Sequence, residues 1–139
     1  MIARAEKCII FGVESTLKII SVAIGGAIGA VARYLINISP LVRVFEHFPL
    51  PTLVINILGS FLIGFLLIVF TDRADISENL KAAVMIGFIG AFTTFSTFEL
   101  ELYELTKAKQ IAVAAGYLSL SVVVGFLGVL AGVALARRM

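Results

Sequence analysis

The sequence predicts an all-α integral membrane protein with four transmembrane helices, and its composition and charge pattern support this fold class. Of its 139 residues, 60% are hydrophobic and only 14% are charged, and the mean hydropathy is +1.10. In a water-soluble domain, about a quarter of the residues are normally charged. Here the charges lie in clusters that separate four apolar runs, each close to the ~20 residues that a helix needs to cross the hydrocarbon layer.

The four runs are expected to form one domain of residues 19–138, with spans at about 19–38, 50–70, 82–105 and 111–136. Residues 1–18 carry five charges and are expected to be an amphipathic or disordered leader. Pro51 suits the first turn of the second helix, because its missing N–H has no helical partner there. Asp75 or Ser77 is expected to cap the third helix.

The charges and the single cysteine argue against several classes of function. The net charge is +2 and the eleven basic residues form no patch, so the sequence carries no nucleic-acid signal. The lone Cys8 cannot form an internal disulfide, and with one distant histidine it makes no metal site.

The distribution of Lys and Arg indicates how the chain is oriented. With four spans, both termini and the second loop share one side, which holds seven Lys and Arg, against three on the other side. The positive-inside rule therefore favours both termini in the cytoplasm. The bias is modest, so insertion in both orientations stays open.

Polar residues recur on one face of the second span. Thr52, Asn56 and Ser60 are spaced by four residues, which places them on one side of a helix. Gly59 leaves space beside Asn56. Asn56 either binds a neighbouring helix, which contributes ~0.6 kcal/mol, or lines a path for something that accepts hydrogen bonds.

The third span is unlike an ordinary membrane helix, because glycines and threonines crowd the run 87–98. A helix broken at the membrane midplane would free carbonyl and N–H groups that protein, water or an ion must satisfy. Ion sites of transporters lie at such half-helix ends. Alternatively, the hydroxyls bond back to carbonyls four residues earlier and only kink the helix.

The fourth span continues this polar character with Tyr117, Ser121 and Gly125 at four-residue spacing. No Asp, Glu, Lys or His is expected deep in any span. A path of neutral donors, together with the positive ring edges of phenylalanines, would suit a small anion that moves passively.

Small residues at four-residue spacing allow helices to approach closely. They indicate either packing within one chain or an oligomer. The pairs are Gly25 and Gly29, Ser60 and Gly64, and Gly128 and Gly132.

Three segments carry a resemblance to a known family: residues 25–34, 51–61 and 87–99. The most specific is the string Thr-Thr-Phe-Ser-Thr-Phe at 93–98. With these segments the chain resembles the Fluc, or CrcB, fluoride channels over its four spans.

The resemblance implies a dual-topology homodimer, in which two identical chains lie antiparallel in the membrane around two fluoride pores. It implies passive fluoride efflux across the plasma membrane of a bacterium or archaeon, protection against fluoride toxicity, and no enzymatic activity. It also implies a structural sodium ion at the dimer interface, held by the backbone carbonyls of Gly90 and Thr93.

The resemblance further implies which side chains meet the anion. Arg33 is expected near a pore mouth, and Gly125 stands where some members have another serine. The residues expected along the fluoride path are Thr52, Asn56, Thr94, Phe95, Phe98, Tyr117 and Ser121.

Two other classes of membrane protein remain as alternatives. A small multidrug exporter also has four short helices, but it needs a membrane-embedded glutamate, and the only candidate, Glu14, precedes the first apolar run. The second alternative is a membrane scaffold that transports nothing.

Overall fold

The computed structural model describes residues 2–43, 48–73 and 75–139, without the side chains of 2–13, 42 and 43. The described chain is helical, with short connections. The elements are α1 (Ile2–Asn37), the 3₁₀ helix η1 (Pro40–Arg43), α2 (Leu50–Asp72), α3 (Glu78–Lys81), the π-helix η2 (Ala82–Ile89), α4 (Gly90–Phe92), α5 (Phe95–Lys107) and α6 (Ile111–Ala136).

Among the described residues, four segments are long and apolar enough to cross a membrane, which confirms the predicted number of spans. They are Glu14–Asn37, Leu50–Asp72, Glu78–Lys107 and Ile111–Ala136. The first helix begins earlier than expected, because α1 includes residues 2–18 of the expected leader. Cys8 and the loop residues Glu46 and His47 lie outside the described side chains.

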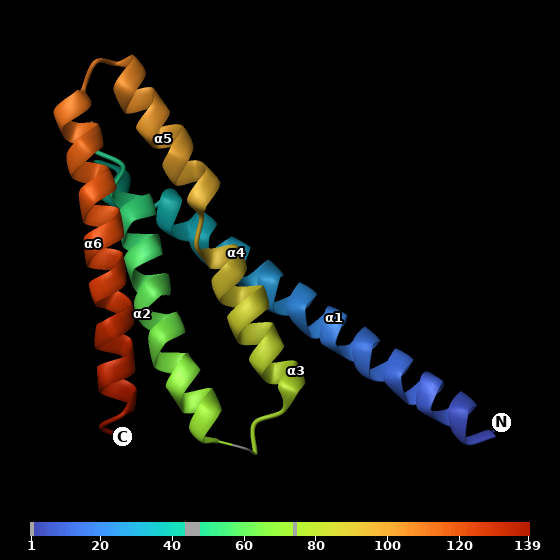
Figure 1. Cartoon of the computed structure of the whole chain (residues 1–139). Helices are drawn as coiled ribbons and strands as arrows, with labels where there is room; N and C mark the ends of the chain where they lie inside the picture. Colours follow the sequence, from blue (N-terminus) through green and yellow to red (C-terminus); the bar gives the residue numbers. More distant parts are fainter. Residues whose placement is uncertain (1, 44–47, 74) are drawn as a thin grey trace.

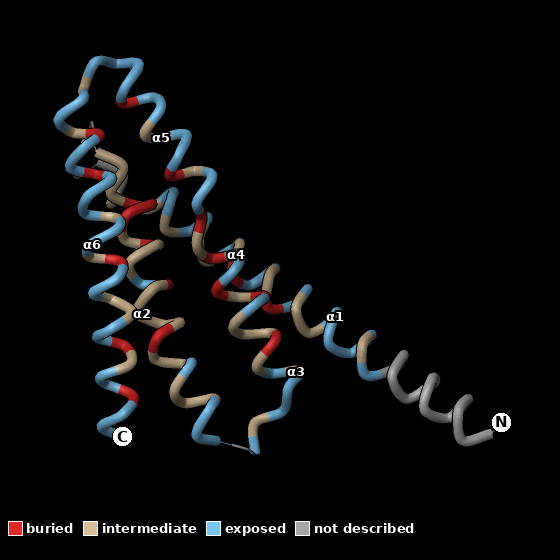
Figure 2. The backbone as a smooth tube through the Cα atoms, viewed as in Figure 1, coloured by how far each residue is buried: buried red, intermediate tan, exposed pale blue. Residues whose placement is uncertain are grey.

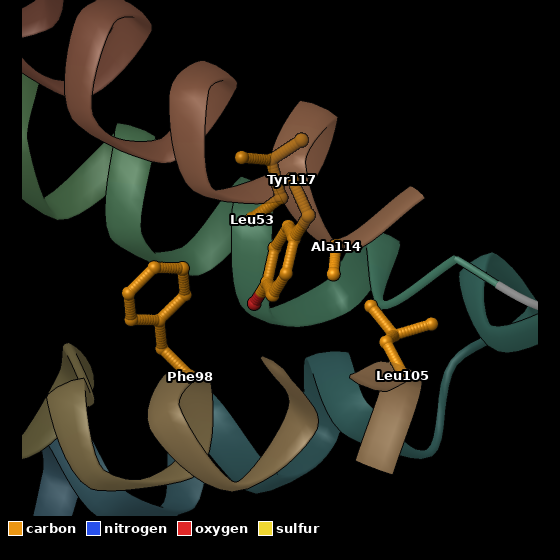
Figure 3. Close-up of a cluster of buried hydrophobic side chains, with 5 residues drawn as sticks. All are labelled: Leu53, Phe98, Leu105, Ala114 and Tyr117. Atoms are coloured by element: carbon orange, nitrogen blue, oxygen red, sulfur yellow. The ribbon is translucent and has the colours of Figure 1, made fainter. Parts of the chain in front are cut away.

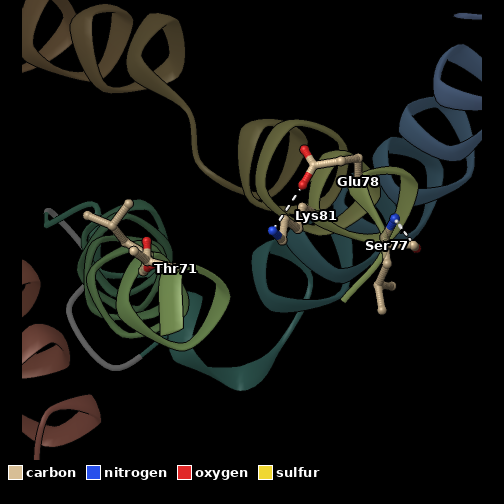
Figure 4. Close-up of polar contacts among 6 residues, drawn as sticks. Thr71, Ser77, Glu78 and Lys81 are labelled. Carbon is tan, nitrogen blue, oxygen red and sulfur yellow. Dashed lines mark hydrogen bonds and ion pairs between the residues drawn. The ribbon is translucent and has the colours of Figure 1, made fainter. Parts of the chain in front are cut away.

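Local sequence explains where the second and third spans begin. Pro51 lies in the first turn of α2, as predicted. Ser77, rather than Asp75, caps α3, because its Oγ accepts a hydrogen bond from the backbone N–H of Leu80 at 3.3 Å. Figure 4 also shows the ion pair between Lys81 Nζ and Glu78 Oε1, at 2.9 Å. An exposed pair of this kind contributes little to stability.

The spans pack mainly as two helix pairs: α2 lies along α6, and α1 lies against η2 and α4 (Figure 1). Glycine makes both contacts possible. A Cβ at Gly132 would collide with the carbonyl oxygen of Phe61, and one at Gly25 with that of Ala83. The small-residue pairs are therefore used for packing within the chain.

The buried core is small and lies where α5 meets α2 and α6. It consists of Leu53, Phe98, Leu105, Ala114 and Tyr117 (Figure 3). Most other apolar side chains on the outer faces of α1 and α6 are exposed (Figure 2). Such faces suit a membrane, because lipid tails are as apolar as the side chains themselves.

The helical conformation of the third span is interrupted at Thr93 and Thr94. Thr93 has φ −77° and ψ 158°, and Thr94 has φ −150° and ψ 114°. Both residues are therefore extended, and α5 begins anew at Phe95. Extended residues cannot continue the ladder of i to i−4 hydrogen bonds, so their backbone groups need other partners.

Candidate functional site

Asn56 supplies the partners that the extended backbone of Thr94 needs. The Asn56 Nδ2 donates to the Thr94 carbonyl at 3.1 Å, and the Thr94 N–H donates to Asn56 Oδ1 at 2.9 Å. Asn56 thus binds a neighbouring segment, which was one of its two predicted roles. A side-chain amide has two N–H groups, so one remains for another acceptor.

The threonine hydroxyls around the interruption bond locally. Thr94 Oγ1 accepts from the Thr97 N–H at 3.4 Å and caps α5, and it donates to Thr97 Oγ1 at 2.9 Å. Thr93 Oγ1 donates to the Ile89 carbonyl at 2.9 Å. The sequence suggested, as one alternative, that hydroxyls bond to carbonyls four residues earlier and only kink the helix. This bond occurs at Thr93, but the helix is interrupted next to it as well.

The carbonyls of Gly90 and Thr93 lose their regular helical donors at the same point. Those donors would be the N–H groups of Thr94 and Thr97, four residues onward. The Thr94 N–H is directed to Asn56 and the Thr97 N–H to the Thr94 hydroxyl. Both carbonyl oxygens are therefore left to accept from other groups or to coordinate a hard cation.

A cleft of about 330 Å³ opens beside the interruption. No ionisable side chain of the described residues lines it. Five of the residues expected along the fluoride path line this cleft: Asn56, Thr94, Phe95, Phe98 and Ser121. The other lining residues are Gly59, Ser60, Ile63, Ile89, Thr93 and Val122.

Two serine hydroxyls extend the polar lining of the cleft. The Ser121 Oγ is buried and has no hydrogen-bond partner among the described residues, so its donor is unused. Ser60 was not among the residues expected to meet the anion. Its position on the same helical face as Asn56 could have indicated that it lines the cleft. Its Oγ lies 3.5 Å from where a Cβ would stand on Gly125, so the glycine leaves room beside it.

The two phenylalanines of the cleft differ sharply in their surroundings. Phe98 is 5% exposed and Phe95 is 74% exposed, with ring centroids 5.9 Å apart. Phe98 meets the Tyr117 ring edge-on at 5.0 Å. Phe98 is therefore held by its own chain, whereas Phe95 projects away from it.

Thr52 and Tyr117 lie beside the cleft and do not line it. Both hydroxyls donate to Glu101: Thr52 Oγ1 to Oε1 and Tyr117 OH to Oε2, each at 2.7 Å. Glu101 lies near the end of the third span, and its pairing with Thr52 and Tyr117 was not expected from the sequence. The signal was its position three residues after Phe98, which puts both on one face of α5.

Arg33 is not at the cleft. It belongs to α1, and the described lining residues come from α2, α6 and the third span. Its expected place at a pore mouth stays a prediction.

Comparison with known proteins identifies the family. The sequence profile of the CrcB-like proteins (Camphor Resistance, CrcB) matches residues 20–133, well over half of the chain. The chain belongs to the CrcB/FluC fluoride channel family. The fluoride-specific ion channel FluC of Stutzerimonas stutzeri is 44% identical over 117 residues, which cover 84% of this chain and 94% of that protein.

Other members of the CrcB/FluC family give the same result. FluC of Hahella chejuensis is 40% identical over 123 residues, covering 88% of this chain and 97% of that protein. FluC of Acidobacterium capsulatum is 40% identical over a stretch of the same length. As a member of a channel family, the chain is a multi-pass membrane protein and not an enzyme.

Proposed function

We propose that this chain forms a fluoride-selective channel that lets fluoride leave the cell passively. The observation that carries the proposal is the cleft of neutral donors, above all the buried Ser121 hydroxyl, which has no hydrogen-bond partner in the described part of the chain. The relatives' names agree with it. Fluoride enters as neutral HF from acidic surroundings and dissociates inside, so a passive anion leak protects against its toxicity.

The chemistry of the cleft suits a small, strongly hydrated anion. The second Asn56 N–H and the hydroxyls of Ser60 and Ser121 replace hydration waters, and the ring edges of Phe95 and Phe98 present their positive side. Without a fixed positive charge in the lining, the anion is bound weakly enough to leave again.

The working unit that we propose is an antiparallel homodimer with two pores. Gly90 is exposed, and no atom lies within 4 Å of where its Cβ would stand. Phe95 projects from the same interruption. A second chain across this side would cover both residues, complete the open wall of the cleft and place the interruption near the membrane midplane.

The carbonyls of Gly90 and Thr93 fit the structural sodium ion that the family implies. Their regular helical donors are engaged elsewhere, and oxygen is the ligand that hard cations prefer. Two such pairs from two chains would form a cage of four carbonyls. Bound there, sodium would supply positive potential beside the anion path and hold the two interruptions together.

Flux into and out of liposomes tests the proposed function. Vesicles that contain the purified protein and are loaded with fluoride should release it within the dead time of a fluoride electrode, while chloride-loaded vesicles should not release chloride. Protein-free vesicles are the control. Proton-driven cation uptake without fluoride release would favour the exporter, and no flux of either kind would favour the scaffold.

Accessibility labelling tests the antiparallel arrangement. After Cys8→Ser, a cysteine at the exposed Lys107, just before the connection to α6, should react with a membrane-impermeant maleimide from both faces in similar amounts. A cysteine at Arg73, in the connection after α2, is the matched site on the opposite side of each chain. Labelling of each site from one face only would mean a single orientation and would rule out the antiparallel pair.

A further inference from the structure

A second cleft, of about 390 Å³, lies between α1 and α3, which pack side by side (Figure 1). It shares no described residue with the cleft beside the interruption. Its volume is in the range of ordinary sites for small molecules. The described residues that line it are all polar: Glu14, Ser15 and Lys18 of α1, and Glu78 and Asn79 of α3.

This second cleft lies at the level of the lipid head groups. Lys18 directly precedes the first apolar run, at 19–38, and Glu78 is the first residue of the third segment that can cross a membrane. Head-group layers flank a hydrocarbon core about 30 Å thick, so the ends of the spans reach them. Towards the core, Ile20 is 50% exposed and Leu80 is 51% exposed. A lipid can therefore place its head group in the cleft and its acyl chains along these side chains.

The lining carries charges of both signs that the chain itself does not fully pair. Glu78 Oε1 accepts a hydrogen bond from Lys81 Nζ at 2.9 Å (Figure 4). Neither Glu14 nor Lys18 forms an ion pair with another described residue. The Lys18 ammonium is thus available to an anionic group, and the Glu14 carboxylate to a cationic one. Electrostatic complementarity favours a ligand that carries both charges close together.

The kind of polar group in the lining selects among lipid head groups. A carboxylate accepts charge-assisted hydrogen bonds from a primary ammonium. A quaternary ammonium has no N–H and is typically held by aromatic rings, and none of the described lining residues is aromatic. A head group with only negative charge would be repelled by Glu14 and Glu78. The lining therefore favours a phosphate next to a primary ammonium.

We propose that this cleft binds the phosphoethanolamine head group of a membrane lipid. Lys18, the Ser15 hydroxyl and the Asn79 amide bind the phosphate. Glu14 binds the ammonium, with Glu78 beside it. The lipid thereby joins the start of the first span to the start of the third. The site is separate from the fluoride path, so its test needs no measurement of transport.

The test is thermal unfolding of the full-length protein in detergent micelles that contain one added lipid. The lipids share the same acyl chains and differ only in the head group: phosphatidylethanolamine, phosphatidylcholine or phosphatidylglycerol. At about tenfold excess over its dissociation constant, phosphatidylethanolamine should raise the melting temperature by about 4 °C. The other two lipids should raise it much less. Native mass spectrometry of the same samples should retain one phosphatidylethanolamine per chain.

Two variants of Glu14 test the charge pattern. Glu14→Lys replaces attraction of the ammonium by repulsion, so it should weaken phosphatidylethanolamine binding about tenfold or more. It should also turn the preference to phosphatidylglycerol, whose head group carries only the negative charge. Glu14→Gln removes the charge, keeps the shape and should weaken phosphatidylethanolamine binding by a smaller factor. Glu104→Lys, at an exposed site on α5, is the matched control and should keep the wild-type preference.

Three outcomes would overturn the proposal. Equal melting temperatures with phosphatidylethanolamine and phosphatidylcholine would mean that the cleft is a solvated surface that does not distinguish head groups. A wild-type lipid preference in both Glu14 variants would mean that the lipid binds elsewhere. An equal shift with water-soluble phosphoethanolamine in lipid-free detergent would mean that the ligand is a soluble compound rather than a lipid. Fluoride release tests the proposed function separately and alters none of these outcomes.

Discussion

The two sides of the interruption in the third span differ in how far a single chain provides hydrogen-bond and packing partners for them. On the inner side, Asn56 bonds both backbone groups of Thr94, and Tyr117 packs against Phe98. On the outer side, Phe95 is 74% exposed, and a Cβ at Gly90 would meet nothing beyond its own helix. Both sides lie within a few residues of each other in the same segment.

The difference indicates which functions belong to one chain and which need a partner. The inner side is rigid, because each polar backbone group of Thr94 has a defined partner from α2, and it can position donors for an anion without help. The outer side has apolar bulk and carbonyls but no partner among the residues that the structure describes. Substitutions on the inner side should therefore change conduction and stability together, whereas those on the outer side should change assembly or conduction without changing the stability of the single chain.

The largest effect is expected at the centre of the inner side. Asn56→Asp keeps an acceptor for the Thr94 N–H but removes the donor to the Thr94 carbonyl and puts a negative charge in the cleft. Repulsion of an anion about 4 Å away, at an effective dielectric constant of about 20, costs about 4 kcal/mol. Fluoride efflux should therefore fall about a thousandfold.

The structure also predicts that this variant loses about 1–3 kcal/mol of stability, because a carbonyl is left without its donor. Thermal unfolding in detergent measures that loss. Asn37→Asp, at the exposed end of α1, is the control that adds the same charge outside the cleft. An assembled Asn56→Asp channel with undiminished efflux would show that the anion does not pass Asn56.

A pair of matched substitutions separates the two sides directly. Phe98→Ile removes a buried ring and should lower both flux, by tenfold or more, and stability, by about 1–3 kcal/mol. Phe95→Ile should lower flux without lowering the stability of the chain, because its ring is exposed. Efflux and thermal unfolding are measured for both, and Phe126→Ile, at an exposed site on α6, should change neither.

A series of substitutions at Phe95 tests the role of its ring edge. Ile, Leu and Met at Phe95 differ in volume, but none has an aromatic edge. Flux that simply follows side-chain volume through this series would contradict a role for the quadrupole and would leave Phe95 as bulk.

The sequence predicted the number of spans, because apolar length is a local property, whereas a break of the third helix at the membrane midplane stays a prediction. Five of the residues that the sequence placed along a fluoride path line the cleft, since Asn56 and Ser121 are polar where hydrocarbon offers no partner, and their role toward the anion stays a prediction. It missed Glu101, because a carboxylate near the end of a span looks like a loop residue until Thr52 and Tyr117 are known to face it. Pairing between distant helices is a tertiary property that no single segment carries.

The outer side is tested by adding bulk where the chain alone has room. A Cβ at Gly90 meets no atom beyond its own helix, so Gly90→Leu should leave the fold intact and reduce the dimer about tenfold if a partner packs there, with flux falling in proportion. Size-exclusion chromatography with light scattering measures the dimer. Gly116→Leu is the matched control, because a Cβ there also meets nothing.

The two glycines distinguish a partner from lipid. Lipid can move away from a new side chain, whereas a packed second chain cannot. If Gly90→Leu forms the same dimer as Gly116→Leu and conducts as well, the partner does not cover the interruption, and the sodium site proposed for its carbonyls loses its second pair of ligands. Gly90→Ala, the milder change, should fall between the wild type and Gly90→Leu.

The smallest effect is expected where the inner side extends beyond Asn56. Ser60→Ala removes one neutral hydroxyl from the cleft, and one such hydrogen bond is worth about 0.5–1.5 kcal/mol, so efflux should fall about threefold with no loss of assembly. Ser96→Ala, at an exposed site on α5, should have no effect. Gly125→Ser places a hydroxyl next to Ser60 and should restore part of the flux to Ser60→Ala. Unchanged efflux in Ser60→Ala would mean that the anion path ends at Ser121 and that Asn56 is the only residue of α2 that contributes to it.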